Sequence, residues 1–198
     1  MIGSICLIKI SSQKIVPALC LEEKSDTLLF AQLRKATDED IFNTQDRDKM
    51  ARVNKGKPKR DQIRIREKYE INTVFVDRPK GLNSKSVVMV KKLYSVKKND
   101  IIKNIAQVSE EIVIKCKSLI EQVRRIAELQ KELQVLKKKV QLAQMNNEKY
   151  THHELRIEKI LGEIGYKRQK NKEKRIKTYG NYREVPNKGF IKIYYGGR

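Results

Sequence analysis

The chain has 198 residues, of which 45 are lysine or arginine and 24 are aspartate or glutamate, so its formal net charge is +21. A charge of this size and sign is typical of proteins that bind nucleic acid, and the alternatives are an anionic membrane or an acidic protein partner. Hydrophobic residues make up 39% of the chain, which is enough for one full core but not for two.

The N-terminal half predicts a small antiparallel β domain. Brief apolar runs end at polar or turn residues, at a spacing typical of all-β folds. Pro17 has no N–H to donate, so we expect it at the start or edge of its strand. The predicted strands cover residues 3–10, 15–21, 27–33, 70–76 and 86–90.

The sequence predicts neither a membrane span nor a disulfide framework. The apolar run near the N-terminus contains Lys9 and is too short to cross a bilayer. Three cysteines, Cys6, Cys20 and Cys116, are odd in number and far apart. They are therefore expected to be reduced core residues of a cytoplasmic protein.

A polar stretch, residues 37–69, interrupts the strands and predicts a long functional loop. Ten cations lie between positions 47 and 68, around the run Lys55-Gly56-Lys57-Pro58-Lys59-Arg60. Such cations can bind backbone phosphates, and the alternative is a solvated loop with interleaved acids. The acids Asp38, Glu39 and Asp40 are interpreted as exposed. The predicted phosphate contacts of this region are Arg34, Lys35, Arg52, Lys55, Lys57, Lys59, Arg60 and Arg64.

From Ser109 the hydrophobic period changes to that of a helix, with Ser109 as the predicted cap and Glu110 and Glu111 in the first turn. Apolar residues then recur every three or four positions up to Val140. This narrow stripe favours a coiled-coil-like oligomerisation seam. The alternative is a helical hairpin in which a second apolar face, residues 155–164, folds back on the first helix.

The last segment, residues 166–198, interleaves cations with five of the eight tyrosines. Cations on phosphates and rings under unstacked bases are how single strands are bound without strict sequence reading. The alternative is a small tyrosine core. The predicted contacts in this tail are Lys167, Arg168, Lys170, Lys172, Lys174, Arg175, Tyr179 and Tyr182.

The order of the strand motifs resembles that of the MazF/PemK family of toxin endoribonucleases. Gly81-Leu82 leads to Ser86-Val87-Val88, then to Leu93-Tyr94-Ser95-Val96-Lys97, and Ile105-Ala106-Gln107-Val108-Ser109 opens a helix. Near the N-terminus, Gly3-Ser4-Ile5 and Pro17-Ala18-Leu19-Cys20-Leu21 are similar to the family's first two strands. The resemblance covers about residues 1–123 and is best from 81 to 112.

The resemblance implies a small antiparallel SH3-like β-barrel with a terminal helix. Together with the residue patterns it predicts an α+β fold with three parts: the barrel over residues 1–108, a long helix and helical hairpin over 109–165, and a basic tyrosine-rich tail over 166–198. It also implies a homodimer with single-stranded RNA bound across the dimer face, an antitoxin protein as a further partner, and RNA cleavage without a metal.

At the positions where the family has its catalytic arginine and threonine, this chain has Val16 and Arg34. Valine can neither neutralise a phosphate nor move a proton. Arg34 supplies a fixed charge but is a poor acid, because its pKa is above about 12. The remaining candidates for catalysis are therefore Arg34, as a phosphate clamp, and Thr37 beside it.

No cofactor or metal site is predicted. Phosphate-binding and dinucleotide-binding glycine motifs are absent from the sequence, and the adjacent His152 and His153 do not share a helix face. The function predicted is RNA binding of the MazF/PemK toxin type, with metal-independent endoribonuclease activity. One alternative is a catalytically inactive nucleic-acid-binding adaptor that dimerises through its helix. Another is a DNA-binding accessory protein of a mobile element.

Overall fold

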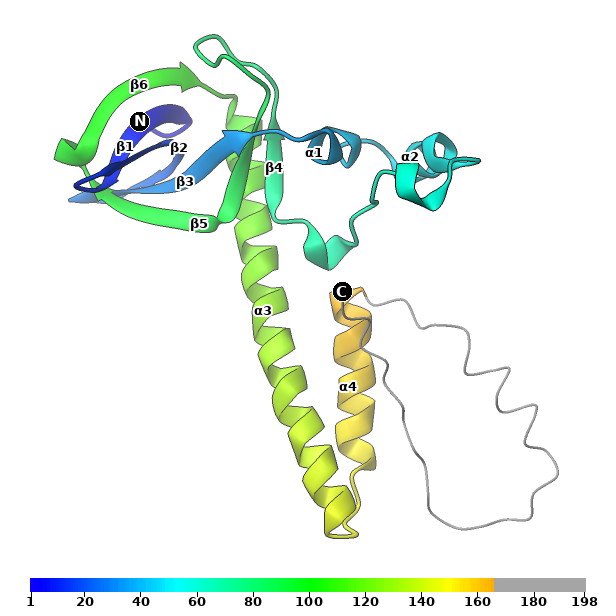
Figure 1. The fold of residues 1–198 in the computed structure, drawn as a ribbon. Coiled ribbons are helices and arrows are strands. Elements are labelled where there is room, and N and C mark those ends of the chain that lie inside the picture. The colour runs from blue at the N-terminus through cyan, green and yellow to red at the C-terminus, as the bar shows by residue number, and fades with distance from the viewer. Residues whose placement is uncertain (166–198) are drawn as a thin grey trace. The chain divides into compact units, whose positions relative to one another are not determined.

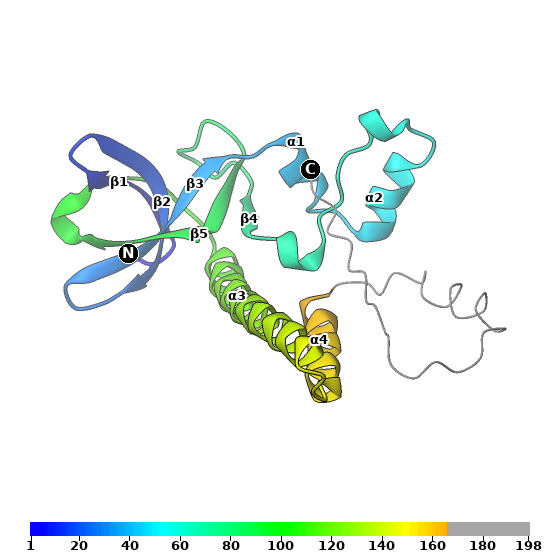
Figure 2. The same ribbon diagram turned by 60° about the horizontal axis from the view of Figure 1, so that its bottom comes forward.

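The computed structural model describes residues 1–165. Six strands are followed by two long helices, and a segment with short helices lies between the third and fourth strands (Figures 1 and 2). The strands are β1 (Ser4–Ser11), β2 (Lys14–Glu23), β3 (Thr27–Lys35), β4 (Thr73–Val76), β5 (Ser86–Lys97) and β6 (Ile101–Gln107). The helices are α1 (Asp38–Phe42), α2 (Arg47–Asn54), α3 (Glu110–Met145) and α4 (Thr151–Ile164), with 3₁₀ turns η1 (Lys59–Asp61), η2 (Lys68–Glu70) and η3 (Lys98–Asp100).

All strands pair in one antiparallel sheet in the order β4-β5-β3-β2-β1-β6. The sheet is antiparallel and curls strongly (Figure 1), in part as predicted for a small barrel, but among the described residues its edge strands β4 and β6 do not pair, so the sheet is open. Closure requires two edges that meet along their length, and β4 has only four residues.

Two strands differ from the sequence prediction. The predicted strand at 86–90 continues as β5 through Lys97. Its first residues pair with β4, and its pairing with β3 extends to Lys97. The strand β6, which completes the other side of the sheet, was not identified as a separate strand. Pro17 lies inside an interior strand rather than at its start, but β3 pairs with β2 only from Ala18 onward. At Pro17, β2 therefore has a paired strand on one side only, β1, and the missing N–H of the proline is not needed for pairing with β3.

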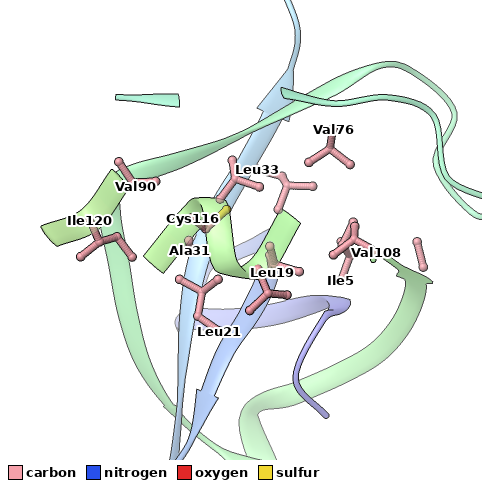
Figure 3. Packing of buried hydrophobic residues seen from close by; sticks show 13 residues of the cluster. Ile5, Leu19, Leu21, Ala31, Leu33, Val76, Val90, Val108, Cys116 and Ile120 are labelled. Atoms are coloured by element: carbon pink, nitrogen blue, oxygen red, sulfur yellow. The ribbon is translucent and has the colours of Figure 1, made fainter. Parts of the chain in front are cut away.

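Both faces of the sheet are covered. Ile5, Leu19 and Ala31 point to a core shared with α3 (Figure 3), whereas Cys6, Cys20 and Phe30 point to a second core on the other face. Because successive side chains of a strand point to opposite faces, neighbouring residues belong to different cores. This explains why the strands read as nearly continuous apolar runs.

The three cysteines are buried and unpaired, as predicted. Burial raises the pKa of the Cys20 thiol to about 11 and that of the Cys116 thiol to about 12. Thiols with such pKa values stay protonated at neutral pH and serve as small apolar packing residues.

The long helix begins after Ser109, as predicted, although the Ser109 side chain makes no capping hydrogen bond. Its apolar stripe is used twice within the chain. The first half, with Cys116 and Ile120, packs on the sheet, and the second half, with Leu129, Leu133 and Leu136, packs on α4. The structure therefore shows the intramolecular hairpin alternative in place of an open seam.

Candidate nucleic-acid interface

The segment between β3 and β4, residues 36–72, is here called the insertion. It was predicted to be a loop, and this is wrong, because it contains α1, α2 and two 3₁₀ turns. Helix α1 begins with a capping box in which the Thr37 hydroxyl accepts a hydrogen bond from the Asp40 N–H, while the Asp40 carboxylate accepts one from the Thr37 N–H.

The two limbs of the insertion are joined by the side chain of one asparagine. Asn43 Nδ2 donates to the Arg64 carbonyl at 2.9 Å, and the Arg66 N–H donates to Asn43 Oδ1 at 2.8 Å. An amide side chain that both donates to and accepts from the backbone makes the same two hydrogen bonds as a paired residue of a neighbouring strand. The limbs, which are more than 20 residues apart in sequence, are thereby held together.

A second asparagine closes the tip. Asn54 Nδ2 donates to the Ile63 carbonyl at 2.8 Å, and the Ile63 N–H donates to Asn54 Oδ1 at 3.0 Å. Inside this closure lie residues 55–62, here called the lysine loop. Gly56 has φ +81° with open space where a Cβ would be, and Gln62 Nε2 donates to the Lys57 carbonyl at 2.9 Å.

At its base the insertion is fixed to β3 by Asp40, which is only 4% exposed. Arg34 forms a bidentate pair with this carboxylate, Nη1 to Oδ2 at 2.6 Å and Nη2 to Oδ1 at 3.0 Å. Arg66 Nη1 donates to Oδ1 at 2.8 Å, and the Thr37 hydroxyl donates to Oδ2 at 2.8 Å. Arg66 also pairs with Glu39 at 2.8 Å.

Charge is balanced in this cluster, since two guanidinium groups face two carboxylates. Burial by itself would raise the pKa of Asp40, but the hydrogen bonds from Arg34, Thr37 and Arg66 outweigh it and hold that pKa well below its usual range. The interpretation of Asp38, Glu39 and Asp40 as exposed loop acids is therefore wrong for Asp40. The Thr37-x-x-Asp40 spacing is the signal in the sequence that identifies its capping role.

The structure divides the cations of the insertion into two groups. Three arginines are paired with acids of the insertion: Arg47 with Glu67 at 2.6 Å, Arg64 with Glu70, and Arg66 with Glu39 and Asp40. The others are exposed and form no ion pair within residues 1–165, apart from a 3.8 Å contact of Arg60, whose side chain is 86% exposed, with its neighbour Asp61. This exposed group is Lys49, Arg52, Lys55, Lys57, Lys59, Arg60 and Lys68.

The predicted phosphate contacts thus fall into two groups, those exposed to solvent and those paired with carboxylates. Lys35 is exposed at the end of β3, and the lysine loop brings four predicted cations together. Arg34 and Arg64, by contrast, are engaged with carboxylates. The predicted tail contacts Lys167, Arg168, Lys170, Lys172, Lys174, Arg175, Tyr179 and Tyr182 lie outside the described residues.

Both catalytic candidates are held by the same carboxylate. Arg34 and Thr37 meet at Asp40: Arg34 donates to this carboxylate through Nη1 and Nη2, and Thr37 donates through its hydroxyl. Val16, at the position of the family's arginine, is buried in the core on the other face of the sheet. Arg34 and Thr37 are thus brought together, but as parts of a charge-balanced structural cluster.

Within residues 1–165, no three histidine, cysteine, aspartate or glutamate side chains gather as metal ligands would. The same part of the chain contains no helix that is both long enough and apolar enough to span a membrane.

No protein-family model and no curated protein matches the chain. Among solved structures, the Mycobacterium tuberculosis toxin MazF-mt6 is similar with a TM-score of 0.40 and 15% identity, covering 62% of this chain and 96% of that one. An endoribonuclease in complex with its cognate antitoxin, from a mycobacterial species, has a TM-score of 0.40 and 8% identity, covering 62% of this chain and 92% of that one. Likenesses of this size say nothing about activity.

Proposed function

We propose that this protein binds RNA through the phosphate backbone and that the lysine loop with the adjoining end of α2 is a principal contact. The proposal rests on the observation that the cations of the insertion form two groups, one paired with acids and one exposed to solvent. Arginines at the base of the insertion are neutralised by acids. The cations at its tip face solvent, and within residues 1–165 the 3.8 Å contact of Arg60 with Asp61 is the one ion pair among them.

Physical chemistry favours phosphate as the ligand of such a tip. Four like charges within six residues, Lys55 to Arg60, repel one another. Binding to a polyanion relieves this repulsion, and the protein's cations release the counterions condensed on the polyanion. The closure at Asn54 holds the cations in place before binding, so less conformational entropy is lost when the complex forms. RNA, rather than DNA, is chosen on the resemblance to MazF/PemK proteins.

We further propose that binding occurs without cleavage. Attack of a 2′-hydroxyl on its phosphate needs a proton acceptor, a proton donor and a cation for the developing negative charge. Arg34 and Thr37, the candidates for these roles, are hydrogen-bonded to Asp40. The runner-up function, a metal-independent endoribonuclease, requires the Arg34–Asp40 pair to open when RNA binds. The homodimer and the antitoxin partner stay predictions of the resemblance.

The binding proposal is tested by the salt dependence of affinity for a long RNA that contains both stems and single-stranded regions. Replacing Lys55, Lys57, Lys59 and Arg60 with alanine should lower the slope of log K against log salt by about 3, at roughly 0.7–0.9 per lost phosphate contact. A control with the same loss of charge replaces Lys9, Lys14, Lys97 and Lys103, which are exposed on the sheet strands.

An unchanged slope in the lysine-loop variant, or an equal change in the sheet control, would count against this interface. The cleavage question is settled by incubating the same RNA with the protein in EDTA. Intact RNA is expected. Fragments with 2′,3′-cyclic phosphate ends that disappear in Arg34→Ala would instead establish the endoribonuclease.

A further inference from the structure

A small cavity lies where the base of the insertion meets the sheet, beside the contact of α1 with β4. Its volume is about 40 Å³, which is room for roughly three water molecules at ~10–15 Å³ each. It is open to solvent, because two residues of its wall, Thr44 and Ile71, are exposed. The other lining residues that matter here are Arg66, Thr73, Phe75 and Val87.

Phe75 faces this cavity and belongs to no core. Side chains of a strand alternate between its two faces: Val74 and Val76 of β4 pack in the core shared with α3, whereas Thr73 and Phe75 line the cavity. Among the described residues, Phe75 is a member of none of the three apolar clusters, and its side chain is half-buried. One face of an aromatic ring on an edge strand is therefore available to a ligand.

Two hydroxyl groups of the cavity wall offer hydrogen bonds of opposite kinds. The Thr44 hydroxyl donates to the Ile41 carbonyl at 2.7 Å, so its oxygen is left as an acceptor. The Thr73 oxygen accepts from Arg66 Nη1 at 3.4 Å, so its O–H is left as a donor. The charge of Arg66 is balanced by the two acids with which it pairs. The cavity is therefore suited to an uncharged polar ring rather than to an ion.

The insertion and the strand beside it thus have both components that proteins combine to bind single strands, namely cations for the phosphates and a ring for a base. Of the two aromatic residues between positions 43 and 76, Tyr69 packs against the hairpin and Phe75 faces the cavity. In both views α1 lies between β4 and α2 (Figures 1 and 2), so the cavity is at the base of the insertion and the lysine loop is at its tip. A cavity of this volume admits the edge of one base and leaves the sugar and phosphate outside, where cations can reach them.

From these observations we infer that the cavity receives one unpaired base of the bound RNA, with Phe75 as the ring on which the base stacks and Thr44 and Thr73 as its hydrogen-bond partners. A base inside a duplex is stacked and paired, and entering a pocket would require it to be flipped out. The RNA at this site is therefore single-stranded. The inference rests on the proposed RNA binding and adds the class of RNA and a contact that does not depend on charge.

The experiment uses the full-length protein and two probes: an RNA single strand of about 12 nucleotides without self-complementarity, and the same ribose-phosphate chain without bases. Phe75→Leu keeps an apolar side chain in β4 and removes the ring. It should weaken binding to the RNA strand about fivefold or more, because a stacking contact is lost. The slope of log K against log salt should stay unchanged, because no phosphate contact is lost. The chain without bases should bind equally to Phe75→Leu and to the parent protein.

A second variant tests the cavity without changing the ring. Thr73→Val has the shape of the parent residue and suits a strand, and the loss of one hydrogen bond should weaken binding to the RNA strand about two- to tenfold. Tyr94→Leu is the matched control for Phe75→Leu. Tyr94 is a half-buried ring of the same sheet that packs against the core on the other face, so its replacement should leave binding unchanged. Thermal unfolding of each variant shows whether the fold is retained, and Thr73→Val decides the matter if Phe75→Leu does not fold.

Failure of the inference and failure of the proposed function are distinguishable. The inference is overturned, while RNA binding stands, if the folded cavity variants bind the RNA strand as tightly as the parent protein. It is also overturned if they lose as much affinity for the chain without bases, or if Tyr94→Leu weakens binding as much as Phe75→Leu does. If the alanine variant of the lysine loop keeps the salt slope of the parent protein, the proposed function itself fails.

Discussion

Asp40 is the residue on which the placement of the insertion depends. Its carboxylate accepts hydrogen bonds from three side chains. Arg34 belongs to β3, Thr37 is the N-cap of α1, and Arg66 lies on the far limb of the insertion. Three separate pieces of chain are therefore joined at one buried charge. Each partner is a donor, so the carboxylate is satisfied only when all three pieces are in place.

We expect Asp40→Asn to lower the free energy of unfolding by about 3 kcal/mol, because two guanidinium groups then lose a charged partner at a buried site. Urea denaturation followed by circular dichroism measures the change. Asp38→Asn, on the same helix but exposed, is the matched control and should have little effect. Equal stability of the two variants would show that the cluster contributes nothing.

The same carboxylate predicts a pH dependence. The pKa of Asp40 is lower in the folded protein than in the unfolded chain, so the unfolded chain binds a proton first as the pH falls. The stabilisation is complete above the unfolded pKa of about 3.9 and is lost as the pH drops toward the folded pKa. The parent chain should therefore lose stability below about pH 4 more steeply than Asp40→Asn in denaturation measured across this range.

Helix α3 illustrates how one element can serve two parts of a fold. Its 36 residues would extend about 54 Å at 1.5 Å per residue, which is more than a small sheet can cover. The half beyond the sheet is covered by α4, with Ile160 and Ile164 buried against Leu129 and Leu133. Arg156 pairs with Glu132 at 2.7 Å across the two helices.

At this scale we expect Ile160→Ala to cost about 2–4 kcal/mol of unfolding free energy, since Ile160 is 0% exposed and its removal leaves a cavity between the helices. Leu155, on the same helix, is 64% exposed, so Leu155→Ala should change stability by less than about 0.5 kcal/mol. Thermal unfolding distinguishes the two. Similar losses would mean that α4 does not pack as described.

The hairpin is also connected to the insertion. Tyr69, in η2, packs against the apolar cluster between α3 and α4, and Lys68 lies next to the end of α4, with its Cβ 3.9 Å from where a Cβ on Gly165 would be. The far limb of the insertion is thus held by the sheet through Arg66 and by the hairpin through Tyr69. This leaves the lysine loop as the part of the insertion that projects into solvent.

Over the whole molecule, two regions are rich in cations: residues 47–68 contain ten and residues 166–198 contain eleven. Deleting the latter removes eleven basic and two acidic residues, so the net charge falls from +21 to +12. We expect the shortened chain to keep the core of residues 1–165 and to bind RNA with a shallower salt dependence. Titrations at several salt concentrations measure this, and an unchanged slope would exclude a phosphate-binding role for the tail.

Combining the deletion with the alanine substitutions in the lysine loop tests whether the two regions act separately. If each region neutralises its own phosphates, the changes in slope should add. The same titrations supply the measurement. A combined change much smaller than the sum would mean that both regions contact the same phosphates.

Several features of this protein could be predicted from its sequence, because they follow from local periodicity. The first three strands are short apolar runs bounded by polar residues, and the start of α3 and the second apolar face at 155–164 express the 3.6-residue repeat of a helix. The exposed cations of the lysine loop are likewise local, since four charges in six residues cannot all be buried.

Only the tertiary structure decided what depends on residues far apart in the chain. Hydrogen bonds between the Asn43 side chain and the backbone of Arg64 and Arg66 hold the predicted loop as an ordered insertion. Asp40 joins Arg66, which is 26 residues away in the sequence, to the nearby Arg34 and Thr37. Whether an arginine is available to a phosphate depends on which carboxylate lies beside it, as for Arg34 and Arg64. Electrostatic pairing acts through space over a few ångströms, and sequence separation carries no information about that distance.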